Sequence, residues 1–213
     1  MKTITISNEE AIKIHFRSNT KVGDITYFSG FMAAIRDARK ATSRNEDTGE
    51  KIPEKHYGSW LGAIGYMATL NQIGNCFKPK KSALIEGNPI IKALSYFSSL
   101  SKAEREAIYA LRCSFTHDYS LSNINHDNPL RQHRFNVCQG SEFIVKLPKD
   151  KWNGDYNNRT QNNCTIISLE GFGDLVEGII KKLIIMANNE ELECTLNGGC
   201  NELLLRYSFY AKQ

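Results

Sequence analysis

Apolar residues recur at helical spacing along most of the chain, with polar stretches between the periodic segments. One clear i, i+3, i+4, i+7 stripe consists of Phe28, Phe31, Met32, Ile35 and Ala38. This spacing predicts a helix with one buried face. Similar patterns predict further helices near 8–16, 57–77, 89–97, 101–119 and 170–187, and one more in the tail after residue 199.

The region before the last long helix has the composition of β-structure instead. Segments 134–138 and 142–147 are rich in β-branched and aromatic residues and flank Gln139-Gly140-Ser141, which predicts a hairpin. An Asn-rich loop follows, and segment 165–169 predicts a third strand. The expected fold is therefore mainly α. It is a single domain over residues 1–213, a helical bundle with a small antiparallel β insertion at approximately 130–169.

Composition narrows the class of protein without naming a function. With 41% apolar and 23% charged residues among 213, the chain is not wholly disordered, collagen-like or a coiled coil. The N-terminal residues contain no apolar segment typical of a signal peptide. The most apolar stretch, 175–186, is too short to span a bilayer and is interrupted by Lys181-Lys182. We therefore expect a soluble, cytoplasmic protein with no membrane partner.

The six cysteines show no CxxC pair, so reduced thiols are expected. A disulfide between Cys194 and Cys200, which flank a Gly-Gly turn, is the alternative. Cys113, His117, His126, His133 and Cys138 have no spacing typical of a metal site. No metal or other cofactor is expected.

The most informative residues are Arg112 and His117, near the end of the helix that Ser101 and Glu104 open as a capping box. An arginine is always cationic and can bind a phosphate through two hydrogen bonds. A histidine can exchange a proton near neutral pH. Together they suit metal-free cleavage of an RNA phosphodiester, with His117 as acid or base and Arg112 on the phosphate.

Helix geometry complicates this interpretation. Five residues at 100° each leave ~140° between the two side chains. They converge on one substrate only if the helix ends or bends near Thr116, or if a second subunit completes the site. The alternative is structural: Arg112 pairs with a carboxylate, and His117 caps the negative end of the helix.

The stretch resembles the signature of HEPN domains, which are helical bundles with an Arg, four to six residues and a His. Leu111-Arg112, Phe115 and His117-Asp118-Tyr119 are similar to the Arg-x4-His-x-Tyr form of HEPN toxins that pair with a nucleotidyltransferase antitoxin. The resemblance covers roughly residues 20–120 and 165–190. Cys113 departs from it, because Asn, Asp or His often follows the Arg in active members.

The resemblance implies a metal-independent endoribonuclease in phage defence or a toxin–antitoxin system, acting on RNA as a homodimer. It implies catalytic roles for Arg112 and His117, with Cys113, Asp118 and Tyr119 shaping the site. Tyr119 matches the position that a nucleotidyltransferase partner modifies; a packed aromatic is the alternative. The rival function is a noncatalytic HEPN-like module that binds RNA or a partner, or mediates dimerisation.

Other basic and aromatic residues are weaker candidates. Arg131, His133 and Arg134 form a basic cluster that, with Lys78, Lys80 and Lys81, predicts an RNA-binding cleft. Scattered solvated charge is the alternative. Two interpretations also remain for Arg36, Arg39, Lys40 and Arg44, which form either a solvated face or a phosphate-binding one. Trp152, in the polar loop, is a candidate for stacking on a base.

Overall fold

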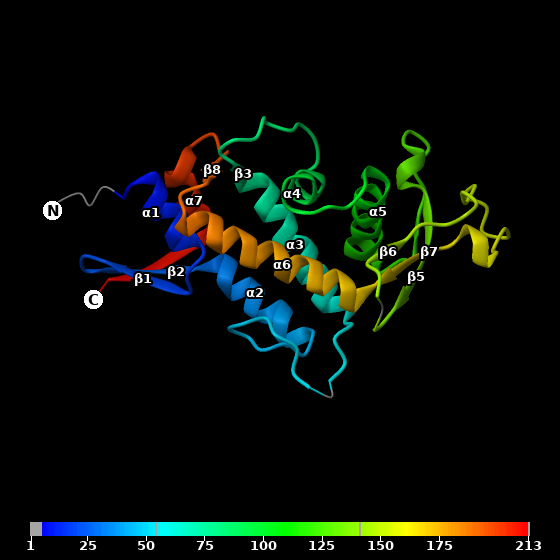
Figure 1. Cartoon of the computed structure of the whole chain (residues 1–213), viewed down its shortest axis with the longest axis horizontal. Coiled ribbons are helices and arrows are strands. Elements are labelled where there is room, and N and C mark those ends of the chain that lie inside the picture. The colour runs from blue at the N-terminus through cyan, green and yellow to red at the C-terminus, as the bar shows by residue number, and fades with distance from the viewer. Residues whose placement is uncertain (1–5, 54, 141, 213) are drawn as a thin grey trace.

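The computed structural model describes residues 6–53, 55–140 and 142–212. Helices make up most of the regular structure (Figure 1). The α-helices of the described chain are α1 (Asn8–His15), α2 (Gly30–Ala41), α3 (Trp60–Cys76), α4 (Pro89–Phe97), α5 (Lys102–Asp118), α6 (Leu169–Asn188) and α7 (Gly199–Tyr207). Two short 3-10 helices are η1 (Pro129–Arg131) and η2 (Gln161–Asn163).

The strands form three sheets in the described part of the chain. The first, of order β1-β2-β9, consists of β1 (Asn19–Val22), β2 (Ile25–Ser29) and β9 (Ser208–Lys212). The second pairs β3 (Phe77–Pro79) with β8 (Leu192–Cys194). The third, of order β4-β5-β7-β6, consists of β4 (Ser122–Asn123), β5 (His133–Cys138), β6 (Val145–Lys146) and β7 (Thr165–Ser168).

The prediction of a mainly α bundle with one small antiparallel insertion was wrong. The chain is 48% helical and 17% strand, with three sheets, which makes it an α/β fold. The largest sheet is mixed, because β5 and β7 run parallel while the other two pairs are antiparallel. The HEPN-like bundle expected from the Arg–His motif therefore does not describe the fold of this chain.

The predicted hairpin also failed, although its strands exist. β5 and β6 do not pair with each other, since β7 lies between them and bonds to both. β7 is the most buried of the three, with Thr165, Ile167 and Ser168 inaccessible to solvent. A central position gives such a strand backbone hydrogen bonds on both edges. Periodicity predicts a strand but cannot identify its partner.

The two smaller sheets were missed for local reasons. Phe28 was interpreted as the first position of a helical stripe, but it lies in β2, and Ser29 caps α2 by accepting a hydrogen bond from the Met32 amide. The tail was expected to be one helix, yet α7 ends at Tyr207 and β9 pairs with β2. That pairing joins segments about 180 residues apart, which a local pattern cannot indicate.

Several helix predictions are confirmed in detail. Ser101 and Glu104 form the capping box of α5, each side chain bonding the other residue's backbone amide. Asn88 caps α4, whose first residue is Pro89. Gly74 of α3 faces α4 so closely that an added Cβ would lie 1.7 Å from the Pro89 carbonyl oxygen. A glycine there allows the two helices to pack against each other.

Arg39 of α2 and Arg44 of the following loop, which the sequence left as either solvated or phosphate-binding, are buried. Arg39 forms a two-pronged ion pair with Glu177 of α6, at 2.9 and 2.8 Å, and Tyr66 donates to the same carboxylate at 2.8 Å. Arg44 pairs with Asp174, one turn earlier on α6, at 2.8 Å. These bonds fasten α2 and the following loop to α6. Neither arginine is free to bind a phosphate.

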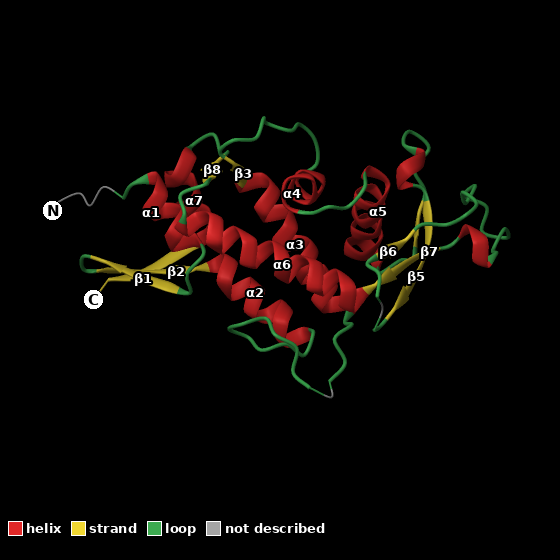
Figure 2. Ribbon diagram, viewed as in Figure 1, coloured by secondary structure: helices red, strands yellow, loops and turns green. Residues whose placement is uncertain are grey.

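α6 runs along the molecule between two sheets (Figures 1 and 2). The β1-β2-β9 sheet lies near the C-terminal end of α6 in these views, beside α1 and α7. The mixed sheet lies at the other end, where β7 leads directly into α6. A single apolar core connects the helices and the inner face of the mixed sheet. In the described chain, no helix has both the length and the apolar character needed to cross a membrane.

Candidate functional site

α5 carries both Arg112 and His117 in its C-terminal half. The helix continues without a break from Lys102 to Asp118, so it neither ends nor bends at Thr116. Arg112 is half-buried and His117 is exposed. Their positions differ by ~140° of rotation and ~7.5 Å of rise. Neither residue lines any of the four best-formed pockets of the described chain. None of these four pockets therefore brings the two side chains together.

The Arg112 guanidinium stands out among the arginines. Within the described residues it makes no hydrogen bond or ion pair, although the side chain is half-buried. The other arginines that are buried or half-buried all have acceptors: Arg39, Arg44, Arg105, Arg131 and Arg134. The alternative in which Arg112 pairs with a carboxylate is not what the structure contains.

A set of connected side chains lies beside Arg112. Arg131 donates to the buried Glu106 at 2.6 Å and lies over the Tyr109 ring, 4.5 Å from its centre. Cys113 lies one helical turn from Tyr109 on α5. Burial raises the Tyr109 pKa above its usual value, with Cys113 adding to the shift and the charges of Arg131 and Arg112 opposing it. Tyr109 is therefore a neutral hydroxyl at pH 7.

Tyr119 is held at the end of an aromatic stack. It caps α5 in a left-handed conformation, at φ 56°, and is 49% exposed. Its ring stacks on Trp60 at 6.2 Å, and Trp60 stacks on Phe115 at 4.8 Å. Asp118 is exposed and accepts a hydrogen bond from the Ser120 amide. Tyr119 is thus both packed on one side and accessible on the other.

The predicted basic cluster does not form one surface. Arg131 is occupied by Glu106, and this bond raises its pKa. His133 is buried, with Nε2 donating to the Leu130 carbonyl at 2.9 Å and Nδ1 accepting from the Thr165 hydroxyl at 2.8 Å. Burial lowers the His133 pKa, so the ring is neutral at pH 7. Both residues hold η1 and the mixed sheet in place.

Lys78, Lys80 and Lys81 lie at the opposite end of α6 from Arg134. Lys78 pairs with Glu193 of β8, and the Lys80 amide donates to the carbonyl of Glu191, just after α6 ends. Arg134 lies in β5, beside the strand that precedes α6. A helix of 20 residues spans ~30 Å, so these lysines and Arg134 do not line a common cleft.

Arg134 belongs instead to a groove that the sequence did not indicate. The groove has a volume of about 630 Å³ and is also lined by Lys146, Lys149 and Arg159. These cations come from β5, from β6 and from the loop after β6, and they share one surface because β7 bonds to both β5 and β6. The prediction that Trp152 is exposed and able to stack on a base was wrong. Trp152 is buried, and its indole N–H donates to the Asp155 carbonyl, which fixes the adjoining loop.

The cysteines and histidines form no metal centre in the described chain, where no group of three or more His, Cys, Asp or Glu side chains is placed to hold an ion. All six cysteines are free thiols, so Cys194 and Cys200 are not joined in a disulfide, and the Cys200 thiol donates to the Asn8 carbonyl at 3.4 Å.

Comparisons of the chain with protein-family models, with curated proteins and with solved structures find no match.

Proposed function

We propose that the protein is a metal-independent endoribonuclease in which Arg112 binds the scissile phosphate and His117 transfers the proton. The observation that carries the proposal is the unpaired Arg112 guanidinium, half-buried on the same helix as an exposed histidine. A half-buried cation without an acceptor is suited to an anionic ligand. The Arg-x4-His-x-Tyr resemblance supports the choice of RNA and, as its setting, phage defence or a toxin–antitoxin system.

The reaction needs two groups and the substrate's own nucleophile. As base, His117 takes the proton of the 2′-hydroxyl, and the 2′-oxygen attacks phosphorus. The bond from phosphorus to the 5′-oxygen breaks, and that oxygen leaves with the proton that His117 took from the 2′-hydroxyl. The products are a 2′,3′-cyclic phosphate and a 5′-hydroxyl. Arg112 stabilises the negative charge that develops on the phosphoryl oxygens. Asp118, Tyr119 and Cys113 border the site.

The ~140° between the two side chains requires a second copy of the chain. In a homodimer that joins the outward sides of two α5 helices, Arg112 of one copy and His117 of the other can face the same phosphate. A two-fold interface brings the same surface of each copy together, so it forms two such sites.

The first test is cleavage of a mixed RNA pool in the presence of EDTA. Wild type should cleave it and leave 2′,3′-cyclic ends, while His117→Ala and Arg112→Ala each reduce the rate at least ~100-fold. Thr116→Ala, an exposed change between the two, is the matched control and should retain activity. Cleavage by purified His117→Ala at the wild-type rate would contradict the proposal.

A noncatalytic binding or scaffold module is the second candidate. It is favoured by one observation: none of the four best-formed pockets of the described chain holds Arg112 and His117 together. If wild type binds RNA or dimerises but cleaves nothing with a confirmed dimer present, this candidate replaces the nuclease.

A further inference from the structure

The mixed sheet has one covered face and one open face. Phe135, Val145 and Ile167 point inward and are buried in the core beneath the sheet, where α5 and α6 pack. Successive residues of a strand point to opposite faces, so their neighbours point outward. The outward set includes Arg134 and Asn136 on β5, Ile166 on β7 and Lys146 on β6. In Figure 2 the α-helices lie on the inner side of the sheet, and the short η2 lies on the other side.

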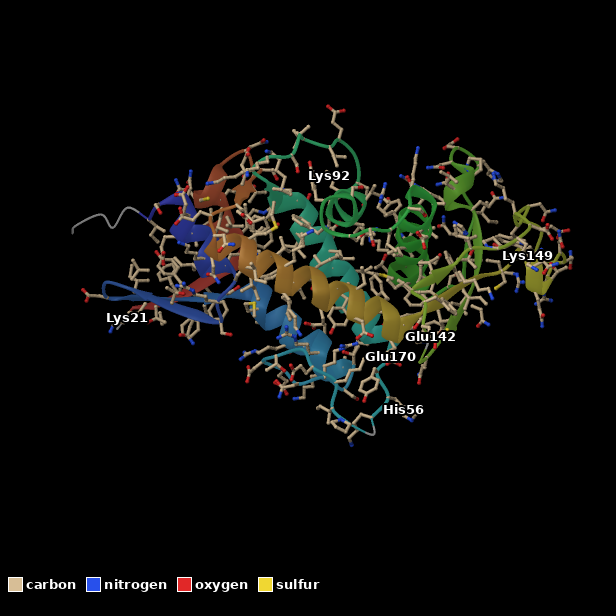
Figure 3. The ribbon with its side chains drawn as sticks, viewed as in Figure 1. Lys21, His56, Lys92, Glu142, Lys149 and Glu170 are labelled. Carbon is tan, nitrogen blue, oxygen red and sulfur yellow. The ribbon has the colours of Figure 1, made fainter. Side chains whose placement is uncertain are left out.

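The open face is the floor of the groove described above. Asn136 is paired with Ile166, and Ile166 with Lys146, so these three side chains form one row across the sheet. The long loop between β6 and β7 adds Lys149 and Arg159 to the lining. Figure 3 shows Lys149 at the end of the molecule formed by the sheet and this loop.

The charge of the groove is not neutralised. Arg134, Lys146, Lys149 and Arg159 line it, and no acidic residue does so in the described chain. Among the described residues, the side chains of Lys146, Lys149 and Arg159 have no hydrogen-bond or ion-pair partner. Glu142 and Glu170, labelled in Figure 3, lie well apart from Lys149 in that view.

Arg134 is oriented by neutral groups only. Its Nη2 donates to the Thr160 carbonyl and, at 3.0 Å, to the Asn163 side-chain oxygen. Its Nε is buried and has no partner in the described chain. By contrast, the buried cations Arg39, Arg44 and Lys78 are paired with carboxylates. A fixed arginine beside three free cations is an arrangement for binding an anion.

The spacing of the cations favours a chain of phosphates over a single one. β5 and β6 are separated by β7, and Arg134 lies two residues from Asn136, the β5 residue in register with Lys146, so the Cα atoms of Arg134 and Lys146 are roughly 12 Å apart. With Lys149 and Arg159 on the following loop, four cations are spread along the groove and can contact successive phosphates of a nucleic-acid backbone. Asn136, Gln161 and Asn162 also line the groove, and their amides can both donate to and accept from base edges. This combination fits single-stranded RNA better than an acidic peptide.

We propose that this groove binds single-stranded RNA, at a site separate from Arg112 and His117. The choice of RNA rests on the proposed function, but the binding itself does not require cleavage. α5 packs under the inner face of the sheet, so the groove and the Arg112–His117 side of α5 are different surfaces of the molecule. The groove would hold a segment of the RNA away from the cut, through phosphates that are the same in every sequence.

The test is fluorescence anisotropy with a labelled mixed-sequence RNA of ~15 nucleotides, using full-length protein that carries His117→Ala so that the probe stays intact. Lys149→Gln with Arg159→Gln removes two free cations. The Kd should rise at least ~10-fold at 0.1 M salt. The salt slope of log K should decrease by ~1.4, because each cation that neutralises a phosphate of a single strand contributes ~0.7 to that slope.

The matched control is Lys181→Gln with Lys182→Gln, two exposed lysines on α6 that change the net charge equally. This pair should bind as the parent does. Equal weakening in both double variants, or no weakening in either, would overturn the inference. Displacement of the RNA by poly-glutamate of the same charge as effectively as by unlabelled RNA would assign the groove to an acidic protein instead.

The two proposals fail separately. If wild type binds RNA through the groove but does not cleave it, the nuclease proposal falls and the groove stands. If wild type cleaves RNA while the groove variants bind normally, the groove inference falls and the nuclease stands. Thermal melting should be unchanged in Lys149→Gln with Arg159→Gln, because both side chains are exposed and unbonded in the described chain.

Discussion

At the scale of single residues, His15 shows what burial does to a titratable group. Its ring is fully buried, stacks on Phe31 at 4.7 Å and meets Phe77 edge-on at 5.2 Å. Neither ring nitrogen has a hydrogen-bond partner in the described chain. Burial lowers the His15 pKa from 6.5 to about 3. The folded protein therefore keeps this ring neutral where the unfolded chain protonates it.

This predicts a loss of stability in mild acid. Below pH 6.5 the unfolded state binds a proton that the folded state excludes, so the free energy of unfolding falls by up to ~1.4 kcal/mol per pH unit until about pH 3. His15→Phe removes this contribution and both unsatisfied nitrogens. It should be more stable than wild type at pH 5, with a smaller difference at pH 7.5, as measured by urea unfolding.

His56→Phe is the control, because His56 is exposed. It should lose stability between pH 7.5 and pH 5 as wild type does. The same pH dependence in His15→Phe as in wild type would show that His15 does not set the acid sensitivity.

At the scale of elements, a buried ion pair between Arg39 and Glu177 joins α2 to α6. The side chains of Arg39 and Glu177 are 3% and 5% exposed. Glu177→Ala leaves Arg39 and the Tyr66 hydroxyl buried without their carboxylate. The expected cost is about 3–5 kcal/mol in unfolding free energy, because an uncompensated charge remains in the core. Urea unfolding at pH 7.5 measures it.

The neighbouring Lys40 offers a matched comparison, since its contact with Glu46 is long, at 4.0 Å, and exposed. Lys40→Ala should cost at most about 1 kcal/mol. If Glu177→Ala cost no more than that, the buried pair would not be what joins α2 to α6.

The elements also show which structural features a sequence can predict. Helices with local signals were predicted well, such as α4 with its Asn88-Pro89 start and α5 with its capping box. What failed was long-range: β7 inserts between β5 and β6, and β9 returns to β2. The candidate functional residues show the same contrast. The motif on α5 identified Arg112 and His117 from the sequence, but no local pattern connects Arg134 with Lys146 and Arg159.

At the scale of the whole molecule, the nuclease proposal predicts complementation between inactive variants. If each site takes Arg112 from one copy and His117 from the other, a mixed dimer of Arg112→Ala and His117→Ala contains one intact site. Co-expression should then restore about a quarter of the wild-type activity, as half of the dimers are mixed and each has one site of two. Cleavage of labelled RNA in EDTA measures this.

Each variant expressed alone supplies the baseline. If the co-expressed pair stays at that baseline while mixed dimers are confirmed by mass, both groups act within one copy of the chain. The requirement for a second copy would then be wrong.

The pairing of β9 with β2 sets the order in which the molecule can be completed during synthesis. The β1–β2 hairpin emerges from the ribosome early, but its third strand follows only after residue 207 has been added. Likewise, β5 and β6 have no shared partner until β7 has been made. Contacts so distant in sequence form slowly and leave strand edges open in the meantime. The nascent chain is therefore most exposed to aggregation and to chaperones until its last strand is in place.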